Sequence, residues 1–228
     1  GYTTVGIAQT QEEMDAHLAN NKPNWGSKWG AGDVMYADLN GDGEVTSGSS
    51  TLGDHGDLTV IGNSYARYNF GLTLDGSWKG LDFSVFLQGV MKRDYWLSGP
   101  YFWGASGDEW QSACFTEHLD YWTPDNPDAY YPKPYFGGIT KNQQVQTGYL
   151  QNAAYLRVKN VQIGYTLPKS WTQKASMESV RFYVSGDNLL TLTGISAIFD
   201  PETLGGDWGP GKLYPLQRTI SVGVNVNF

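Results

Sequence analysis

The feature that most constrains the fold of this chain is a two-residue alternation of apolar and polar side chains in five separate stretches. Such alternation places every second side chain on the same face of an extended strand. The stretches are Tyr68–Gly76, Leu81–Met91, Val161–Leu167, Val180–Gly186 and Thr219–Phe228. Each predicts a β-strand with one apolar and one polar face, so the expected fold class is all-β and antiparallel.

The alternation changes phase once, in residues 153–160. Leu156 and Val158 are apolar at even positions, whereas Val161 and Ile163 are apolar at odd positions. A single extra residue restores the phase of a strand, because side chains alternate with a period of two. We therefore expect a β-bulge near Lys159 and Asn160.

Helical patterning is limited to residues 10–20. Thr10 is a suitable N-cap, and Glu12 and Glu13 lie in the first turn, where the helix dipole favours negative charge. The segment is short and polar. It predicts a surface helix within a loop.

The connections between the predicted strands alternate between short and long. Residues 78–80 form a tight link, and residues 168–179 form a moderate one. The long segments cover about 6–66, 92–151 and 192–215. Long loops are unusual in compact soluble domains, but outer-membrane barrels combine short periplasmic turns with long extracellular loops. The three long segments are therefore predicted to be extracellular.

Composition separates the candidate classes. The chain has 15 Lys and Arg residues against 23 Asp and Glu, a net charge of −8 that excludes a nucleic-acid partner. Only 17% of residues are charged, and the polar strand faces carry mostly Asn, Gln, Ser, Thr and Gly, which suits a barrel lumen. Aromatic residues cluster at the predicted periplasmic ends, as a lipid-boundary girdle requires, namely Trp78, Tyr165, Trp171 and Phe228.

The two strand faces then have defined environments in a barrel. Residues predicted to face lipid are Leu72, Leu74, Val85, Leu87, Val222 and Val224. Residues predicted to face the lumen are Thr73, Ser84, Ser221 and Gly223. A soluble β-sandwich produces the same alternation. A secreted calcium-dependent carbohydrate-binding β-sandwich is therefore the alternative interpretation.

One loop has the pattern of a calcium ligand set. Oxygen-bearing residues at alternate positions are Asp38, Asn40, Asp42 and Glu44. The chain turns at Gly43, as in the first half of an EF-hand loop, and Ca²⁺ requires six to eight oxygens. The twelfth position is Ser49 rather than Glu, so Asp57 or, second, Asp54 must complete the shell. The sequence predicts one structural calcium ion; the alternative is an acidic turn that binds nothing.

Several segments together carry a specific family resemblance. They are residues 33–43 (DVMYADLNGDG), 57–63, 68–71, 155–168 (YLRVKNVQIGYTLP), 180–189, 199–202 (FDPE), 214–215 and the closing strand. In this order they resemble the late-barrel region of SusC/RagA-type TonB-dependent outer-membrane transporters. Residues 46–56 depart from the family pattern and read as an insertion.

The resemblance implies a plugged 22-stranded transmembrane barrel in the bacterial outer membrane. It implies import of glycans or peptides with energy from the TonB complex, beneath a SusD-like surface lipoprotein. Residues 1–228 would form the C-terminal barrel portion, because nothing here matches the N-terminal plug. Five or six strands cannot close a barrel, so the other strands must come from elsewhere. The resemblance also implies that the last strand, ending at Phe228, is the assembly signal for insertion.

Catalytic chemistry is not indicated. His17, His55 and His118 have no metal-ligand spacing. Two carboxylate pairs, Asp108 with Glu109 and Glu117 with Asp120, lie in a long acidic loop, where solvated charge is the usual explanation. We therefore predict that the chain is not an enzyme.

The long loop from Tyr95 to Phe136 is unusually aromatic. Its rings belong to Tyr95, Trp96, Tyr101, Phe102, Trp103, Trp110, Phe115, Tyr121, Trp122, Tyr130, Tyr131, Tyr135 and Phe136. A disordered segment does not carry so many. A self-packed loop core or a docking face is favoured over an aromatic platform for sugar rings or peptides.

Overall fold

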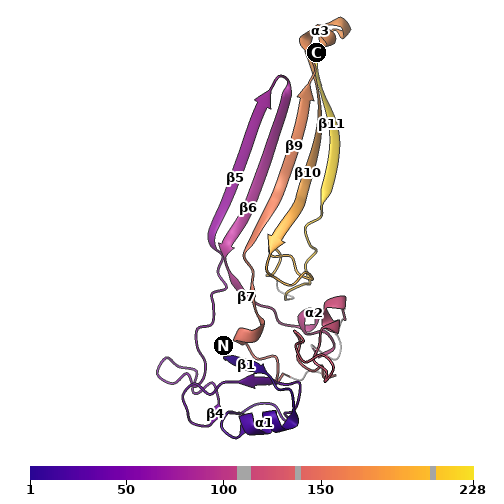
Figure 1. Cartoon of the computed structure of the whole chain (residues 1–228). Coiled ribbons are helices and arrows are strands. Elements are labelled where there is room, and N and C mark those ends of the chain that lie inside the picture. The colour runs from indigo at the N-terminus through magenta and orange to yellow at the C-terminus, as the bar shows by residue number, and fades with distance from the viewer. Residues whose placement is uncertain (107–113, 137–139, 206–208) are drawn as a thin grey trace. The chain divides into compact units, whose positions relative to one another are not determined.

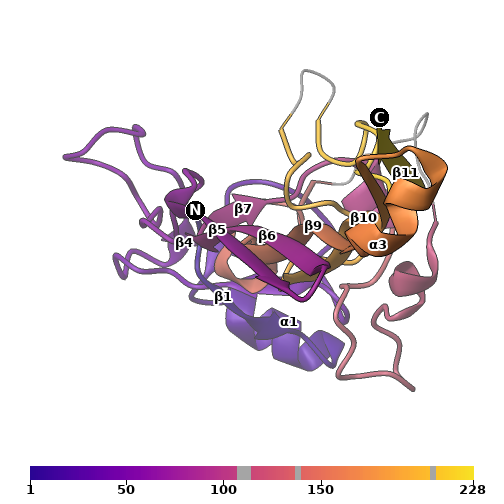
Figure 2. The same ribbon diagram turned by 90° about the horizontal axis from the view of Figure 1, so that it is seen from above.

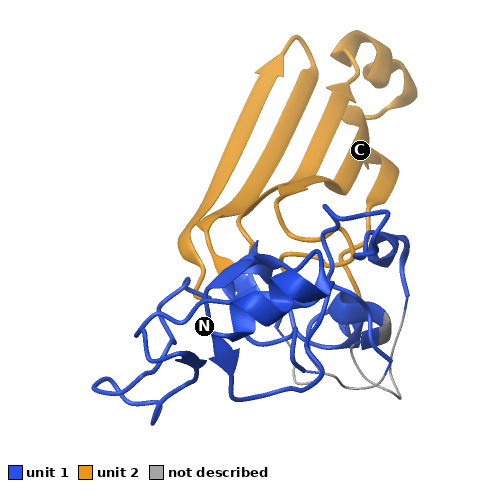
Figure 3. Cartoon of the chain, turned by 60° about the horizontal axis from the view of Figure 1, so that its bottom comes forward, with its two compact units in different colours: residues 1–64, 95–151, 204–213 blue, residues 65–94, 152–203, 214–228 orange. Residues whose placement is uncertain are grey.

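The computed structural model describes residues 1–106, 114–136, 140–205 and 209–228. The chain forms two compact units (Figure 3). Unit 1 comprises residues 1–64, 95–151 and 204–213, and unit 2 comprises residues 65–94, 152–203 and 214–228. Each unit is therefore assembled from three separate stretches of the sequence.

Unit 2 contains an antiparallel five-stranded sheet in the order β11-β10-β9-β6-β5. Its strands are β5 (Arg67–Trp78), β6 (Leu81–Lys92), β9 (Tyr155–Thr166), β10 (Ser179–Thr193) and β11 (Thr219–Asn227). Figure 1 shows them as long ribbons that lie alongside one another, and Figure 2 shows β5, β6, β9 and β10 side by side in that order. All five predicted strands are confirmed. The sheet is open, with β5 and β11 at its edges.

The tight link between β5 and β6 is a two-residue hairpin turn. Trp78 pairs with Leu81, and the two residues between them have positive φ angles, 48° at Lys79 and 88° at Gly80. Positive φ at both central residues defines a type I′ turn, whose twist matches that of the flanking strands. The turn therefore fixes the register of the hairpin.

The predicted bulge in β9 is confirmed. Phe86 of β6 pairs with Asn160, but the next residue, Leu87, pairs with Val158, which leaves Lys159 as the extra residue. The bulge brings Leu156 and Val158 onto the same face as the apolar residues that follow. One face of β9 thus stays apolar along its whole length.

The register places the predicted lipid-facing and lumen-facing residues on opposite faces of the sheet. Leu72 pairs with Leu87 and Leu74 with Val85 on one face, whereas Asp75 pairs with Ser84 on the other. Highly exposed side chains of the apolar face are Phe70, Leu72, Leu74, Phe83, Ile163, Phe182, Val184, Ile220, Val222 and Val224. A β-sandwich would cover this face with a second sheet. In the described chain the apolar face stays open.

The aromatic residues expected in the girdle lie at one end of the sheet. Trp78 precedes the hairpin turn, and its partner Leu81 pairs with Tyr165 across the sheet. Trp171 belongs to the short helix α3 (Lys169–Thr172), and Phe228 follows the last residue of β11. Trp78, Trp171 and Phe228 are 67%, 65% and 89% exposed. These positions match the prediction of an aromatic boundary.

Unit 1 is built from short elements. They are β1 (Thr4–Ile7), α1 (Gln11–Leu18), β2 (Lys22–Pro23), β3 (Val34–Tyr36), β4 (Glu44–Val45), α2 (Pro100–Trp103), η1 (Gly104–Ser106), η2 (Thr116–Leu119) and η3 (Thr147–Tyr149). β1 pairs with β3 and β2 with β4. The Thr10 hydroxyl caps α1 by accepting from the Glu13 amide at 3.1 Å, as predicted, and the helix buries Met14 against Ala8 and Met35.

The remaining elements are the paired strands β7 (Asp94–Trp96) and β8 (Leu150–Asn152), and the 3₁₀ turn η4 (Gln173–Ala175). Across the part of the chain that the structure describes, none of the helices has the length and apolar character needed to cross a membrane.

Candidate functional site

Part of the aromatic loop packs into the interior of unit 1. Phe102, Trp103, Tyr131 and Tyr149 are all buried. Their rings meet mainly edge to face, with centroids 5.1 Å apart for Phe102–Trp103, 5.0 Å for Trp103–Tyr149 and 5.6 Å for Phe102–Tyr131. This geometry stabilises aromatic pairs. The predicted self-packed core of the loop is therefore present, while Trp110 and the pair Asp108 and Glu109 lie outside the described residues.

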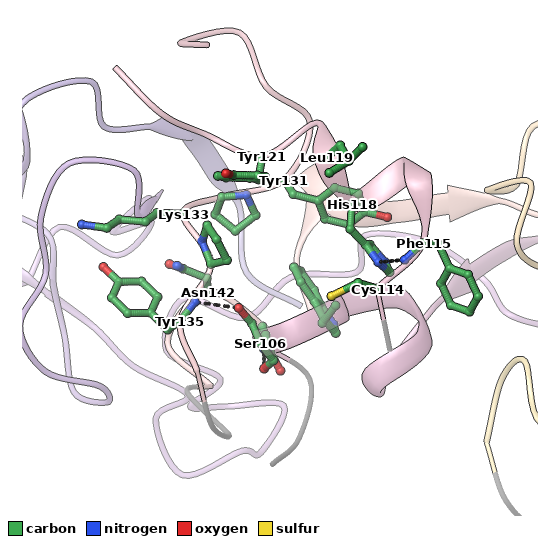
Figure 4. Close-up of a pocket in the computed structure, with 14 residues that line it drawn as sticks. Ser106, Cys114, Phe115, His118, Leu119, Tyr121, Tyr131, Lys133, Tyr135 and Asn142 are labelled. Carbon is green, nitrogen blue, oxygen red and sulfur yellow. Dashed lines mark hydrogen bonds between the residues drawn. The ribbon is translucent and has the colours of Figure 1, made fainter. Parts of the chain in front are cut away.

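Other rings of the same loop line a pocket of about 270 Å³, here called the tyrosine pocket. Its walls include Tyr121, Tyr131, Tyr135, Phe115 and His118. Figure 4 shows Lys133 and Tyr135 on one side of this pocket and Phe115 and Cys114 on the other. Some rings of the loop, including the buried Tyr131, therefore surround an open space.

The imidazole of His118 is fixed by hydrogen bonds at both nitrogens. Nδ1 accepts from the amide of Phe115 at 3.0 Å, so Nε2 carries the proton and donates to the carbonyl of Phe102 at 3.1 Å. The ring also lies 5.3 Å from Tyr131, centroid to centroid. Both nitrogens are occupied in this tautomer. His118 is therefore a wall of the pocket rather than a metal ligand or a general base.

A second, larger pocket of about 640 Å³ adjoins the first and is here called the tryptophan pocket. The two pockets share Tyr121 and the segment Lys133–Tyr135. The tryptophan pocket adds Trp29, Trp122 and Lys28 to its walls. The shared segment is thus a ridge between two aromatic spaces of unit 1.

A buried polar network holds this ridge in place. Lys141 Nζ lies 2.6 Å from Asp33 Oδ2, and the two side chains are 2% and 0% exposed. Asp33 also accepts from Asn142 Nδ2 at 2.9 Å and from the Tyr135 hydroxyl at 3.2 Å. Lys141 Nζ lies 4.2 Å from the centroid of the Tyr135 ring. Since a buried charge requires a partner and hydrogen bonds, this network fixes Tyr135 relative to β3.

The predicted calcium loop is closed by Asp57. Asp57 Oδ1 accepts from the amides of Leu39 and Asn40 at 2.6 and 3.3 Å, and Oδ2 accepts from Thr46 at 2.7 Å. Asp38 accepts from the amides of Gly41 and Gly43 at 2.6 and 2.7 Å. The structure therefore brings Asp57 against the loop.

The other predicted ligands are arranged differently. Asp42 accepts from the Glu44 amide at 2.9 Å and from Asn40 Nδ2 at 3.0 Å, within the turn itself. Asp54 accepts from Ser49 and stays within the insertion. Among the residues that the structure describes, no three His, Cys, Asp or Glu side chains gather as a metal site. Calcium binding by this loop stays a prediction.

In unit 2, the polar face of the sheet carries an ionic cluster. Arg157 Nη2 lies 2.8 Å from Asp200 and Nη1 lies 2.8 Å from Glu202, which also pairs with Lys159 at 3.1 Å. Arg157 is only 3% exposed. The cluster anchors the FDPE segment, residues 199–202, to the polar face at the bulge of β9.

The chain is similar to known proteins in sequence and in structure. No protein-family model matches the chain. TonB-dependent receptor P3 of Formosa agariphila is 29% identical over 86% of this chain and 19% of the receptor. TonB-dependent receptor P26 of the same organism is 28% identical over 100% of this chain and 22% of the receptor. A solved structure of the RagAB peptide transporter is 26% identical, with a TM-score of 0.63, over 86% of this chain and 21% of that chain.

The chain is similar to the SusC/RagA-type TonB-dependent transporters, in agreement with the predicted resemblance. TonB-dependent transporters are outer-membrane proteins, so the predicted location is confirmed. The relatives are named as receptors and transporters, not as enzymes. The chain spans about a fifth of the length of the curated relatives that it matches. The 22-stranded barrel and the role of Phe228 in assembly stay predictions for this chain.

The lysines of unit 1 were not predicted from the sequence. Lys28, Lys133 and Lys141 lie far apart in the sequence, and only the folded unit 1 brings them to one region. A local sequence pattern could have singled out Lys133, because this residue stands between Pro132 and Pro134 and is flanked by tyrosines. No comparable pattern marks Asp33 as the partner of Lys141.

Proposed function

We propose that this chain forms part of the transmembrane wall of a TonB-dependent outer-membrane importer. The observation that carries the proposal is the five-stranded sheet whose apolar face remains exposed along every strand while its other face is polar. Lipid is the environment that such a face requires. The edges at β5 and β11 would pair with further strands of a 22-stranded barrel, because unpaired backbone groups in lipid are costly.

The cargo and partners of the importer are part of the same proposal. The solved RagAB structure is described as a peptide transporter. The family resemblance adds glycans as a second cargo class, a SusD-like surface lipoprotein as partner, and the TonB complex as the energy source. The exposed aromatic pockets of unit 1 are suited to either cargo class, since both present flat apolar surfaces.

Calcium has a structural role in this proposal. Asp38, Asn40, Asp42, Glu44 and Asp57 would hold one ion and order the segment that leads to β5. Supporting it, Asp57 already contacts the backbone of the loop, and carboxylate oxygens that accept amide hydrogen bonds retain lone pairs for a cation.

Spin labels test the transmembrane proposal directly. Labels would be attached at Leu74 and Val222 on the apolar face, and at Thr73 and Ser221 on the polar face, in the complete polypeptide reconstituted in vesicles. We expect the first pair to be reached by oxygen, which dissolves in lipid, and the second by a water-soluble nickel chelate. Equal access of oxygen to both pairs would contradict the proposal.

A further inference from the structure

We propose that the tryptophan pocket binds a ligand that carries a carboxylate next to a flat apolar surface. The proposal deepens the import function, on which it rests for the view that the ligand is cargo. Its basis is the combination of aromatic walls and lysine ammonium groups in one pocket of unit 1.

The aromatic walls are held in fixed orientations. Trp122 is 5% exposed, and its indole nitrogen donates to Gln9 Oε1 at 2.8 Å. The ring of Trp29 packs edge to face against Tyr36, with centroids 6.2 Å apart. The hydroxyl of Tyr135 is held by Asp33 and Lys141 at 3.2 and 3.1 Å. A ligand therefore meets rigid ring surfaces, and little conformational entropy is lost when it binds.

Gly32 allows the walls to approach each other. Its φ angle is +88°, and an added Cβ would lie 2.6 Å from Cβ of Lys133 and against the ring of Trp122. No L-residue with a side chain fits this position without displacing one of those two. The close packing of Trp122 and Lys133 therefore depends on a glycine here.

The charge of the pocket is opposite to that of the chain. The net charge is −8, yet the described residues that line the tryptophan pocket include Lys28 and Lys133 and no Asp or Glu. Neither lysine forms an ion pair with a described residue. Asp33, which contacts the Tyr135 hydroxyl, is fully buried and is neutralised by Lys141. The pocket therefore presents uncompensated positive charge and favours an anion.

The backbones of both lysines are anchored. The carbonyl of Lys28 accepts from Lys141 Nζ at 2.9 Å, and the amide of Lys133 donates to the carbonyl of Gly32 at 2.8 Å. The Lys133 ammonium lies 5.7 Å from the centroid of the Tyr135 ring, which places positive charge beside an aromatic face. A carboxylate attached to a ring would meet both groups at once.

The size of the pocket fits a small ligand or one unit of a longer one. Its volume of about 640 Å³ lies within the range of about 300–1,000 Å³ found for small-molecule sites. The tyrosine pocket across the ridge offers a further 270 Å³ for a neighbouring unit. A carboxylated sugar ring and an acidic peptide with an aromatic residue share the required chemistry.

Binding to the complete polypeptide in detergent tests the proposal, with titration calorimetry as the measurement. The sugar probes are trigalacturonate and its uncharged methyl ester. The peptide probes are Glu-Tyr-Glu and Gln-Tyr-Gln, both blocked at their ends. We expect at least one charged probe to bind at least tenfold more tightly than its neutral counterpart, and the probe that does so identifies the source of the carboxylate.

Two double variants separate pocket charge from overall charge. Lys28→Gln with Lys133→Gln should abolish the preference for the charged probe, at about tenfold per lysine. Lys22→Gln with Lys174→Gln makes the same change in net charge at exposed lysines outside the pocket and should leave the preference intact. Trp29→Leu should weaken charged and neutral probes alike. Equal binding within both probe pairs, or an unchanged preference in the Lys28/Lys133 variant, would overturn the proposal.

The binding experiment and the spin-label experiment can fail separately. Spin labels that place the sheet in lipid, together with no charge preference in binding, would remove only the ligand proposal. A charge preference in a protein whose sheet is not in lipid would remove only the import proposal.

Discussion

Arg181 and Asp82 form a bidentate ion pair although their strands, β10 and β6, are not neighbours. Arg181 Nε lies 2.9 Å from Asp82 Oδ2, and Nη2 contacts Oδ1. Strand β9 runs between them, and the residue that pairs with Asp82 is Gly164. Because glycine has no side chain, the guanidinium can cross β9 directly above its backbone. On the polar face of the sheet, this ion pair thus links β10 to β6 across β9.

The first prediction concerns this crossing. An added Cβ at Gly164 would lie 2.6 Å from Arg181 Cζ, so Gly164→Ala should displace the guanidinium. The coupling energy between Arg181 and Asp82, which is small for a partly exposed pair, should then fall towards zero. A double-mutant cycle in both backgrounds, based on urea unfolding, measures it. Gly71→Ala is the control, because its nearest neighbour is the ring of Phe86 at 3.2 Å.

The second prediction concerns the apolar face. Val224 is 51% exposed on that face, whereas Ser221 pairs with Ser185 on the polar face. Val224→Arg should destabilise the membrane-inserted protein by about 2–4 kcal/mol, and Ser221→Arg by much less. Unfolding from lipid vesicles gives both values. Similar losses for the two variants would show that the faces are wrongly assigned.

The third prediction concerns the network beneath the ridge. Lys141→Met leaves the carboxylate of Asp33 buried without its cation and should cost about 3–5 kcal/mol. Adding Asp33→Asn removes that charge and should restore a measurable part of the loss. Urea unfolding followed by tryptophan fluorescence, with Trp78 and Trp171 of unit 2 replaced by Phe, reports on unit 1, which contains Trp25, Trp29 and Trp122. No recovery in the double variant would argue against an electrostatic cause.

The fourth prediction concerns calcium. Metal analysis of the purified protein should find calcium, and EGTA should make the loop at residues 38–46 sensitive to protease. Asp42→Ala and Asp57→Asn should remove the protection by calcium, but Asp54→Asn should not, because Asp54 contacts Ser49 instead of the loop. Absence of calcium, or full protection in Asp42→Ala, would refute the proposal.

The fifth prediction concerns pH. Hydrogen bonds from the backbone amides of Gly43 and Gly41 hold the pKa of Asp38 below its usual value. A lowered folded-state pKa means that these bonds stabilise the loop above about pH 4 and are lost as pH falls through the folded-state pKa. Hydrogen exchange of residues 38–46, corrected for its intrinsic pH dependence, should therefore rise in acid. Asp38→Asn should show no such step.

The strands could be predicted because their information is local. Alternation over 9 to 11 residues identified β5, β6 and β11, and one change of phase located the bulge near Lys159. The helix could be predicted from Thr10, because an N-cap forms its hydrogen bond within the first turn. Each of these depends on neighbours in the sequence.

The pockets could not be predicted in the same way. Asp33 and Lys141 are 108 residues apart, and nothing near either residue specifies the other. Aromatic composition indicated that the loop is ordered, but it did not separate the buried rings, such as Phe102, from those that line a pocket, such as Tyr121. That division depends on the burial that the tertiary fold imposes on each ring.

The pair formed by Asp33 and Lys141 also sets an order of events in biogenesis. The two residues belong to stretches of unit 1 that the β5–β6 hairpin separates in the sequence. During synthesis the first stretch carries the carboxylate of Asp33. Its cation, Lys141, is added only after the whole hairpin has been synthesised. The cost of burying that lone charge delays closure until then. Unit 1 therefore closes only after residues 95–151 have followed the hairpin.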